Sequence, residues 1–188
     1  MGMAYDYTFK DVLFFRERQQ IDVQNETGDF VGSIVRTSEE AKRQHVRKGT
    51  FYALIGLDGD SRCSISVEKR GLASLKGYSY FMNDQTTEQT YQLADVPVAI
   101  YLYFHIKGKI KGMTFEAYQD WDESIVLKLN KEKFAAISFN EHTFQVDIQI
   151  IKEVDSFFVS PAFLSLIYCI FRMYDIEREI IDQALDLL

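Results

Sequence analysis

The chain has 188 residues, of which 47% are hydrophobic and 14% aromatic, and its formal net charge is −7. This length suits one domain with a sizeable core, and with only 2 prolines there is little room for disordered linkers. A strongly acidic chain is a poor general binder of nucleic acid, because contacts to phosphate supply most of that affinity. We therefore expect a single domain over 1–188 and no nucleic-acid partner.

The first hundred residues predict mainly strands. Ile21 and Val23 alternate with polar residues, and after a polar turn at Gly28 the chain returns as a partner strand over 30–35. Other short alternating or apolar runs follow the same pattern. They span 5–9, 12–15, 51–57, 63–67, 78–82, 90–93 and 98–106.

One segment interrupts this pattern. Residues 37–48 begin with a capping box, in which Thr37 would cap a helix and Glu40 would reach back to its start. Charged side chains occupy most sides of the segment that follows. We therefore predict a short charged helical insertion that lies on the protein surface.

The second half continues with strands. They span 113–118, 124–129, 134–139 and 144–151. The links between them are short and rich in turn-forming residues, such as Asn130 and Asn140. About a dozen short strands at hairpin spacing predict an antiparallel sandwich or barrel.

The segment from 161 to about 174 predicts a helix that is apolar on every side. Ser160 can cap it, and Pro161 takes the first helical position, where its missing N–H costs nothing. Roughly thirteen apolar residues are too few to cross a bilayer, which takes roughly 20. A helix with no polar face must be surrounded by protein, so we expect a core helix enclosed by the strands.

The chain ends in a segment of different character, 175–188. Ile176, Ile180 and Ala184 lie four residues apart among charged residues, which predicts an amphipathic extension. Such a face could bind another protein or a second copy of this chain. A protein-interaction or oligomeric scaffold is therefore one hypothesis for the function.

The order of these elements resembles the tubby C-terminal-like fold, which belongs with the phospholipid scramblase-like superfamily. The likeness is greatest to compact LURP-one-related proteins, and we expect a bacterial member. Four segments carry the resemblance. They are the opening strand with Phe14 and Phe15, the hairpin over 21–31, the strand pair 134–139 and 144–151, and the helix from Pro161. The resemblance implies a mainly β fold, an antiparallel barrel of about a dozen strands around a central apolar helix.

The same resemblance implies a non-catalytic binding or adaptor module. Its expected ligand is an anionic phospholipid or a membrane surface, and its expected location is the cytoplasm with peripheral membrane association. The chain shows no match to the phosphoinositide-binding positions of tubby proteins or to the calcium-binding segment of scramblases. We therefore expect no cofactor and no metal.

A basic run supplies the candidate site. His105, Lys107, Lys109 and Lys111 alternate with other residues, so in a strand they would project from one face as a cationic ridge. Such a ridge could bind an anionic lipid surface. The alternative is a strand edge protected by lysines, or a solvated hairpin.

The remaining candidates for chemistry are weak. Three carboxylates at 120–123 surround Trp121 and could serve a hydrolase, although the segment also resembles a turn. The histidines have no His or Cys at metal-ligand spacing. Cys63 and Cys169 lie in apolar segments, so we predict two buried free thiols and a reducing compartment.

Overall fold

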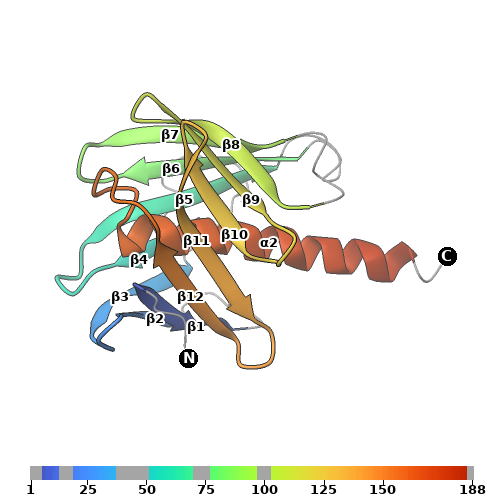
Figure 1. The fold of residues 1–188 in the computed structure, drawn as a ribbon, viewed down its shortest axis with the longest axis horizontal. Helices are drawn as coiled ribbons and strands as arrows, with labels where there is room; N and C mark the ends of the chain where they lie inside the picture. Colours follow the sequence, from blue (N-terminus) through green and yellow to red (C-terminus); the bar gives the residue numbers. More distant parts are fainter. Residues whose placement is uncertain (1–5, 13–18, 37–50, 70–76, 97–102, 186–188) are drawn as a thin grey trace.

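Twelve antiparallel strands form a closed barrel in the computed structural model (Figure 1). The structure describes residues 6–12, 19–36, 51–69, 77–96 and 103–185. Each strand pairs with its neighbours in sequence, and β1 closes the barrel against β12. The strands are β1 (Tyr7–Lys10), β2 (Gln20–Asn25), β3 (Phe30–Arg36), β4 (Phe51–Ile55), β5 (Ser61–Lys69), β6 (Tyr78–Asp84), β7 (Gln89–Asp95), β8 (His105–Ile110), β9 (Met113–Gln119), β10 (Ile125–Leu129), β11 (Glu132–Asn140) and β12 (Gln145–Ile150). The predicted fold class is confirmed.

The predicted hairpin between β2 and β3 shows how local chemistry sets the turns. Gly28 adopts a φ of 83°, a value that suits glycine better than other residues. The side-chain oxygen of Asn25 accepts hydrogen bonds from the backbone N–H groups of Thr27 and Asp29, at 3.1 and 2.8 Å. These bonds close the turn and bring Val23 opposite Gly32 in the barrel.

Strand β8 differs from the prediction, which placed a strand over 98–106. The described strand begins at His105 and continues to Ile110. Gly108 lies within this strand and allows β8 to approach β7 closely. A Cβ atom at this position would be 2.4 Å from the carbonyl oxygen of Gln92 and 2.5 Å from Cδ2 of Leu93. Residues 97–102, the segment 12–15 except for Val12, and the predicted insertion at 37–48 lie outside the described residues.

The barrel encloses the helix α2 (Pro161–Leu185) (Figure 1). Its first turns are buried on every side, including Phe163, Leu166 and Ile167, none of which has any exposed surface. The rings of this helix meet the barrel wall edge to face. Phe163 contacts Phe115 of β9 with ring centroids 5.2 Å apart, and similar contacts recur along the helix. Because aromatic side chains bury large apolar areas, this packing makes the helix the centre of the hydrophobic core.

The start of α2 has the capping chemistry that the sequence predicts. The backbone N–H of Phe163 donates to Oγ of Ser160 at 3.2 Å, and Pro161 is the first helical residue. The helix leaves the barrel at its opposite end and projects beyond it (Figure 1). We call the two ends of the barrel the α2-start end and the α2-exit end.

A buried ion pair holds α2 where it leaves the barrel. Nε of Arg172 lies 2.7 Å from Oδ2 of Asp11, which follows β1 directly. The side chain of Arg172 is 13% exposed and that of Asp11 is 6% exposed. Arg172 also bonds to Asp175 in the next helical turn, and its guanidinium lies 5.3 Å from the ring centroid of Phe139.

Candidate functional site

The basic run of the sequence lies on β8 and in the turn after it. His105, Lys107 and Lys109 share the outer face of β8, since Ile106 and Ile110, which alternate with them, are fully buried in the core. The structure therefore places three of the four predicted residues on one face. The fourth, Lys111, lies elsewhere.

Lys111 lies in the β8–β9 turn with a φ of 49°. Its Nζ is 2.9 Å from Oδ1 of Asp155 and 5.0 Å from the ring centroid of Phe157. Both partners precede α2, so Lys111 points toward the α2-start end of the barrel. The alternation of side chains between the two faces of β8 ends at this turn. Lys111 therefore does not lie on the outer face with the other three residues.

The outer face of β8 is extended by basic residues from other strands. Lys107 is paired in register with Glu116 of β9, Glu116 with Lys128 of β10, and Lys128 with Lys133 of β11. These four side chains therefore form one row across four neighbouring strands. Neighbouring strands are about 4.8 Å apart, so the row spans about 14 Å.

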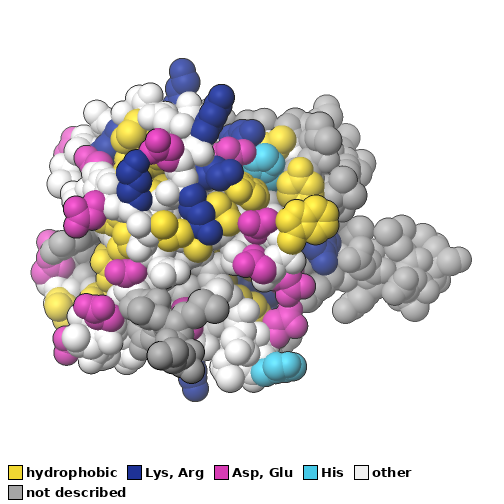
Figure 2. Space-filling model, in the orientation of Figure 1, with side chains coloured by type: hydrophobic (Ala, Val, Ile, Leu, Met, Phe, Trp, Pro, Cys, Tyr) yellow, Lys and Arg dark blue, Asp and Glu magenta, His cyan; other side chains and the backbone are white. Residues whose placement is uncertain are grey.

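We call the four lysines on this surface the basic face. They are Lys107, Lys109, Lys128 and Lys133. Lys107, Lys109 and Lys133 are exposed, and Lys128 is partly buried. Figure 2 shows Lys and Arg side chains gathered over this side of the barrel, with Asp and Glu side chains between and beside them.

Glu116 is the carboxylate within the row. It lies 3.0 Å from Nζ of Lys107 and 2.7 Å from Nε2 of His105. Burial raises the pKa of Glu116, but the hydrogen bonds from Lys107 and His105 outweigh it and hold the pKa below its usual value. Glu116 therefore stays ionised near neutral pH and balances only part of the charge of the lysines around it.

Aromatic rings contact two of the basic residues, Lys128 and His105. Nζ of Lys128 lies 4.7 Å from the ring centroid of Tyr118, a cation–π contact. The ring of Tyr103 stacks on that of His105 with centroids 6.0 Å apart. A hydrogen bond with Tyr118 is the largest cause of the raised pKa of Lys128, so this side chain keeps its charge.

Lys128 and Lys133 were not predicted from the sequence. Both lie outside the basic run. Lys128 is the single charge of the apolar strand β10, and Lys133 follows Glu132 at the start of β11. One sequence feature could have indicated that they lie together, the turn at 130–131. This turn makes β10 and β11 a hairpin and brings the two lysines opposite each other. The pairing with β8 depends on the order of strands in the barrel.

The acidic segment 120–123 forms the turn between β9 and β10. Oδ1 of Asp122 accepts hydrogen bonds from the backbone N–H and the hydroxyl of Ser124, at 3.1 and 2.6 Å. These bonds lower the pKa of Asp122, whereas a general acid needs a raised one. Trp121, at the tip of the turn, is 99% exposed.

The cysteines are buried, and the histidines that the structure describes lie apart from them. Cys63 and Cys169 are both buried free thiols, as predicted. Burial, followed by the charge of Asp84, raises the pKa of Cys63 to about 12. His142 is exposed in the β11–β12 turn, and no group of three or more potential ligands could hold a metal ion within the described part of the chain.

The predicted interaction tail is described only in part. Ile176 is 38% exposed on α2. Ile180 and Ala184 belong to the last turns of the helix, where the side chains lie outside the described residues. Over the described part of the chain, no helix has both the length and the apolar character needed to span a membrane.

Comparison of the chain with protein-family models, curated proteins and solved structures finds no match.

Proposed function

We propose that this protein is a non-catalytic binding module that docks on an anionic phospholipid surface through the basic face. The observation that supports this most strongly is the arrangement of Lys107, Lys109, Lys128 and Lys133 on one outer face of the barrel, in and beside the row that contains Glu116. The chain as a whole carries a charge of −7, so a positive face is a local departure from its charge balance. The resemblance to the tubby C-terminal-like fold supports the same ligand class and a cytoplasmic, peripheral location.

The geometry suits a flat, extended anion better than a single small one. Neither Lys109 nor Lys133 has a carboxylate partner at ion-pair distance among the described residues, and both are exposed. The four lysines lie on β8, β10 and β11, which together with β9 form four neighbouring strands of the barrel wall. Each basic residue near an anionic membrane contributes about 1 kcal/mol, and salt screens this attraction over roughly 10 Å.

Vesicle flotation tests the proposal directly. The protein is mixed with vesicles of phosphatidylcholine alone, or of phosphatidylcholine with phosphatidylserine, at low and at physiological salt. We expect recovery with the phosphatidylserine vesicles only, and less of it at higher salt. The double variant Lys109→Glu/Lys128→Glu should lose at least about 2 kcal/mol of binding, which is roughly a 30-fold loss of affinity.

A matched control separates the basic face from overall charge. The double variant Lys10→Glu/Arg178→Glu makes the same change in net charge outside the basic face, on β1 and on α2, where both side chains are exposed. It should retain most of the binding. Equal recovery on both kinds of vesicle, or equal losses in the two variants, would rule out docking through the basic face.

A further inference from the structure

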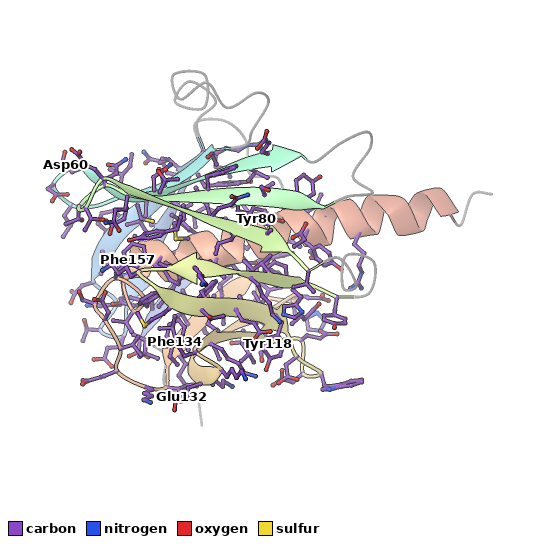
Figure 3. All side chains as sticks on the ribbon, turned by 90° about the horizontal axis from the view of Figure 1, so that it is seen from above. Asp60, Tyr80, Tyr118, Glu132, Phe134 and Phe157 are labelled. Atoms are coloured by element: carbon purple, nitrogen blue, oxygen red, sulfur yellow. The ribbon has the colours of Figure 1, made fainter. Side chains whose placement is uncertain are left out.

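A cavity of about 500 Å³ opens at the α2-start end of the barrel. It lies between the β4–β5, β6–β7 and β8–β9 turns and the segment that leads into α2. Figure 3 shows this end of the barrel, with Phe157 beside the start of α2 and Asp60 in the β4–β5 turn. The volume is within the range of small-molecule sites, about 300–1,000 Å³.

The walls of this cavity are mainly apolar. Leu54 and Val31 come from the barrel strands, Leu57 from the β4–β5 turn, and Phe157 and Pro161 from the start of α2. These side chains would accept the hydrocarbon or aromatic part of a ligand. The interior of the barrel beyond them is filled by α2, so a ligand would lie at the barrel mouth.

A buried carboxylate lies in the wall of the cavity. Asp84 ends β6 in the inward-facing series of that strand, after Tyr80 and Met82, and is only 3% exposed. It accepts hydrogen bonds from the backbone N–H of Thr86 at 3.0 Å and from the hydroxyl of Thr87 at 2.8 Å. Both donors are neutral, and no cationic side chain of the described residues forms an ion pair with Asp84.

Closing a turn does not require such burial. Asp122 also accepts hydrogen bonds from a backbone N–H and a hydroxyl in the β9–β10 turn, both of them from Ser124, and it is exposed to water. Asp84 differs in being held inside a cavity. A carboxylate removed from water is costly unless a positive charge is supplied, and each of its oxygens can accept a second hydrogen bond.

The other charged side chain at the cavity already has a partner. The ammonium of Lys111 is bound to Asp155 and covers the ring of Phe157, so its charge is balanced. The start of α2 is capped by Ser160, and Pro161 has no N–H to offer. The thiol of Cys63, opposite Asp84 in register, stays protonated near neutral pH because burial raises its pKa to about 12. Of the two charged side chains that line the cavity, Lys111 and Asp84, only Asp84 has no ion-pair partner among the described residues.

We propose that this cavity binds a small organic cation, with a protonated amine on Asp84 and an apolar body against Leu54 and Phe157. The acidic net charge of the chain adds a general attraction for cations. This site is separate from the basic face and does not depend on the proposed docking to lipid. The cavity lies at the α2-start end and carries a carboxylate, whereas the basic face lies on the outer wall of the barrel and carries lysines.

Three compounds that share an indole ring and differ in charge test the proposal. Tryptamine carries an ammonium, tryptophol is neutral, and indole-3-propionate carries a carboxylate. Binding is measured by isothermal titration calorimetry, and ¹H–¹⁵N spectra locate the site through the amides of Thr86 and Thr87. We expect tryptamine to bind at least about tenfold more tightly than tryptophol, because its amine makes a charge-assisted hydrogen bond, and indole-3-propionate not to bind.

Two variants and a matched control complete the test. Asp84→Asn keeps a turn-closing oxygen and removes the charge, so tryptamine affinity should fall at least about tenfold. Asp122→Asn makes the same change in an exposed turn and should leave binding unchanged. Val31→Phe fills the cavity from its rim without altering the carboxylate, and should abolish binding even if Asp84→Asn does not fold.

Several results would overturn the cation site. They are the absence of tryptamine binding at millimolar concentration, equal affinity for all three compounds, amide shifts away from the β6–β7 turn, and unchanged binding in Asp84→Asn or in Val31→Phe. Lys109→Glu/Lys128→Glu should bind tryptamine as the parent protein does, so failure of lipid docking and failure of this site are distinguishable.

Discussion

Replacing Arg172 with methionine should destabilise the protein strongly, because it leaves the buried carboxylate of Asp11 without its partner. The side chain of Asp11 is 6% exposed and that of Arg172 is 13% exposed, so both have lost most of their hydration. Removing one member of a buried pair costs about 3–5 kcal/mol. The variant also loses the bond to Asp175 and the contact with Phe139. We expect a loss of about 3–5 kcal/mol in the free energy of unfolding at pH 7.

The size of this loss should depend on pH. Burial is the largest influence on the pKa of Asp11 and raises it, while the charge of Arg172 and several hydrogen bonds oppose the rise. Without Arg172 the pKa rises further. A carboxyl with a raised folded-state pKa stabilises the fold fully below its unfolded pKa of about 4, and that contribution is lost as the pH rises through the folded value. The penalty of Arg172→Met should therefore shrink between pH 7 and about pH 4.

Urea unfolding followed by far-ultraviolet circular dichroism measures this loss. Fluorescence is a poor reporter, since Trp121, the single tryptophan, is 99% exposed in the folded protein. Lys152→Met is the matched control, because its ion pair with Glu132 is exposed and should add little. A loss below about 1 kcal/mol for Arg172→Met, or a loss that stays constant with pH, would refute the reasoning.

Two further predictions concern the core. Phe163→Ala should lower the free energy of unfolding by about 3–5 kcal/mol, because the ring contacts three other phenylalanine rings, and Trp121→Ala should leave it unchanged in the same urea experiment. Cys63 and Cys169 should react with a thiol reagent only as fast as the protein unfolds, since burial raises the pKa of both. Prompt labelling of either thiol in the native protein would contradict their placement in the core.

Much of the architecture could be predicted from local patterns. The alternation in β2 and the turn at Gly28 indicate a hairpin, and the structure shows both. Ser160 and Pro161 mark the start of α2, which begins there. A helix without a polar face must be buried by other parts of the protein, and the short strands that precede it in sequence enclose it. Prediction was less accurate at β8, where the expected strand ended at residue 106 and the described strand continues through Gly108.

The candidate sites were harder to predict, because they combine residues that are far apart in the chain. Lys107 and Lys133 lie in one row only because β8, β9, β10 and β11 are neighbours in register. The burial of Asp84 likewise depends on the cavity between several turns and the start of α2. Asp84 and Asp122 look alike in sequence, since both precede a hydroxyl residue within a short turn.

The sequence by itself determined the strands, the turns and the enclosed helix, since periodicity and capping are properties of neighbouring residues. The tertiary structure decided which charges share a face, which carboxylate is buried and where α2 leaves the barrel. The pairing of Asp11 with Arg172 is an example, because these residues are 161 positions apart. Such contacts depend on barrel closure and register, which arise from the pairing of all twelve strands together.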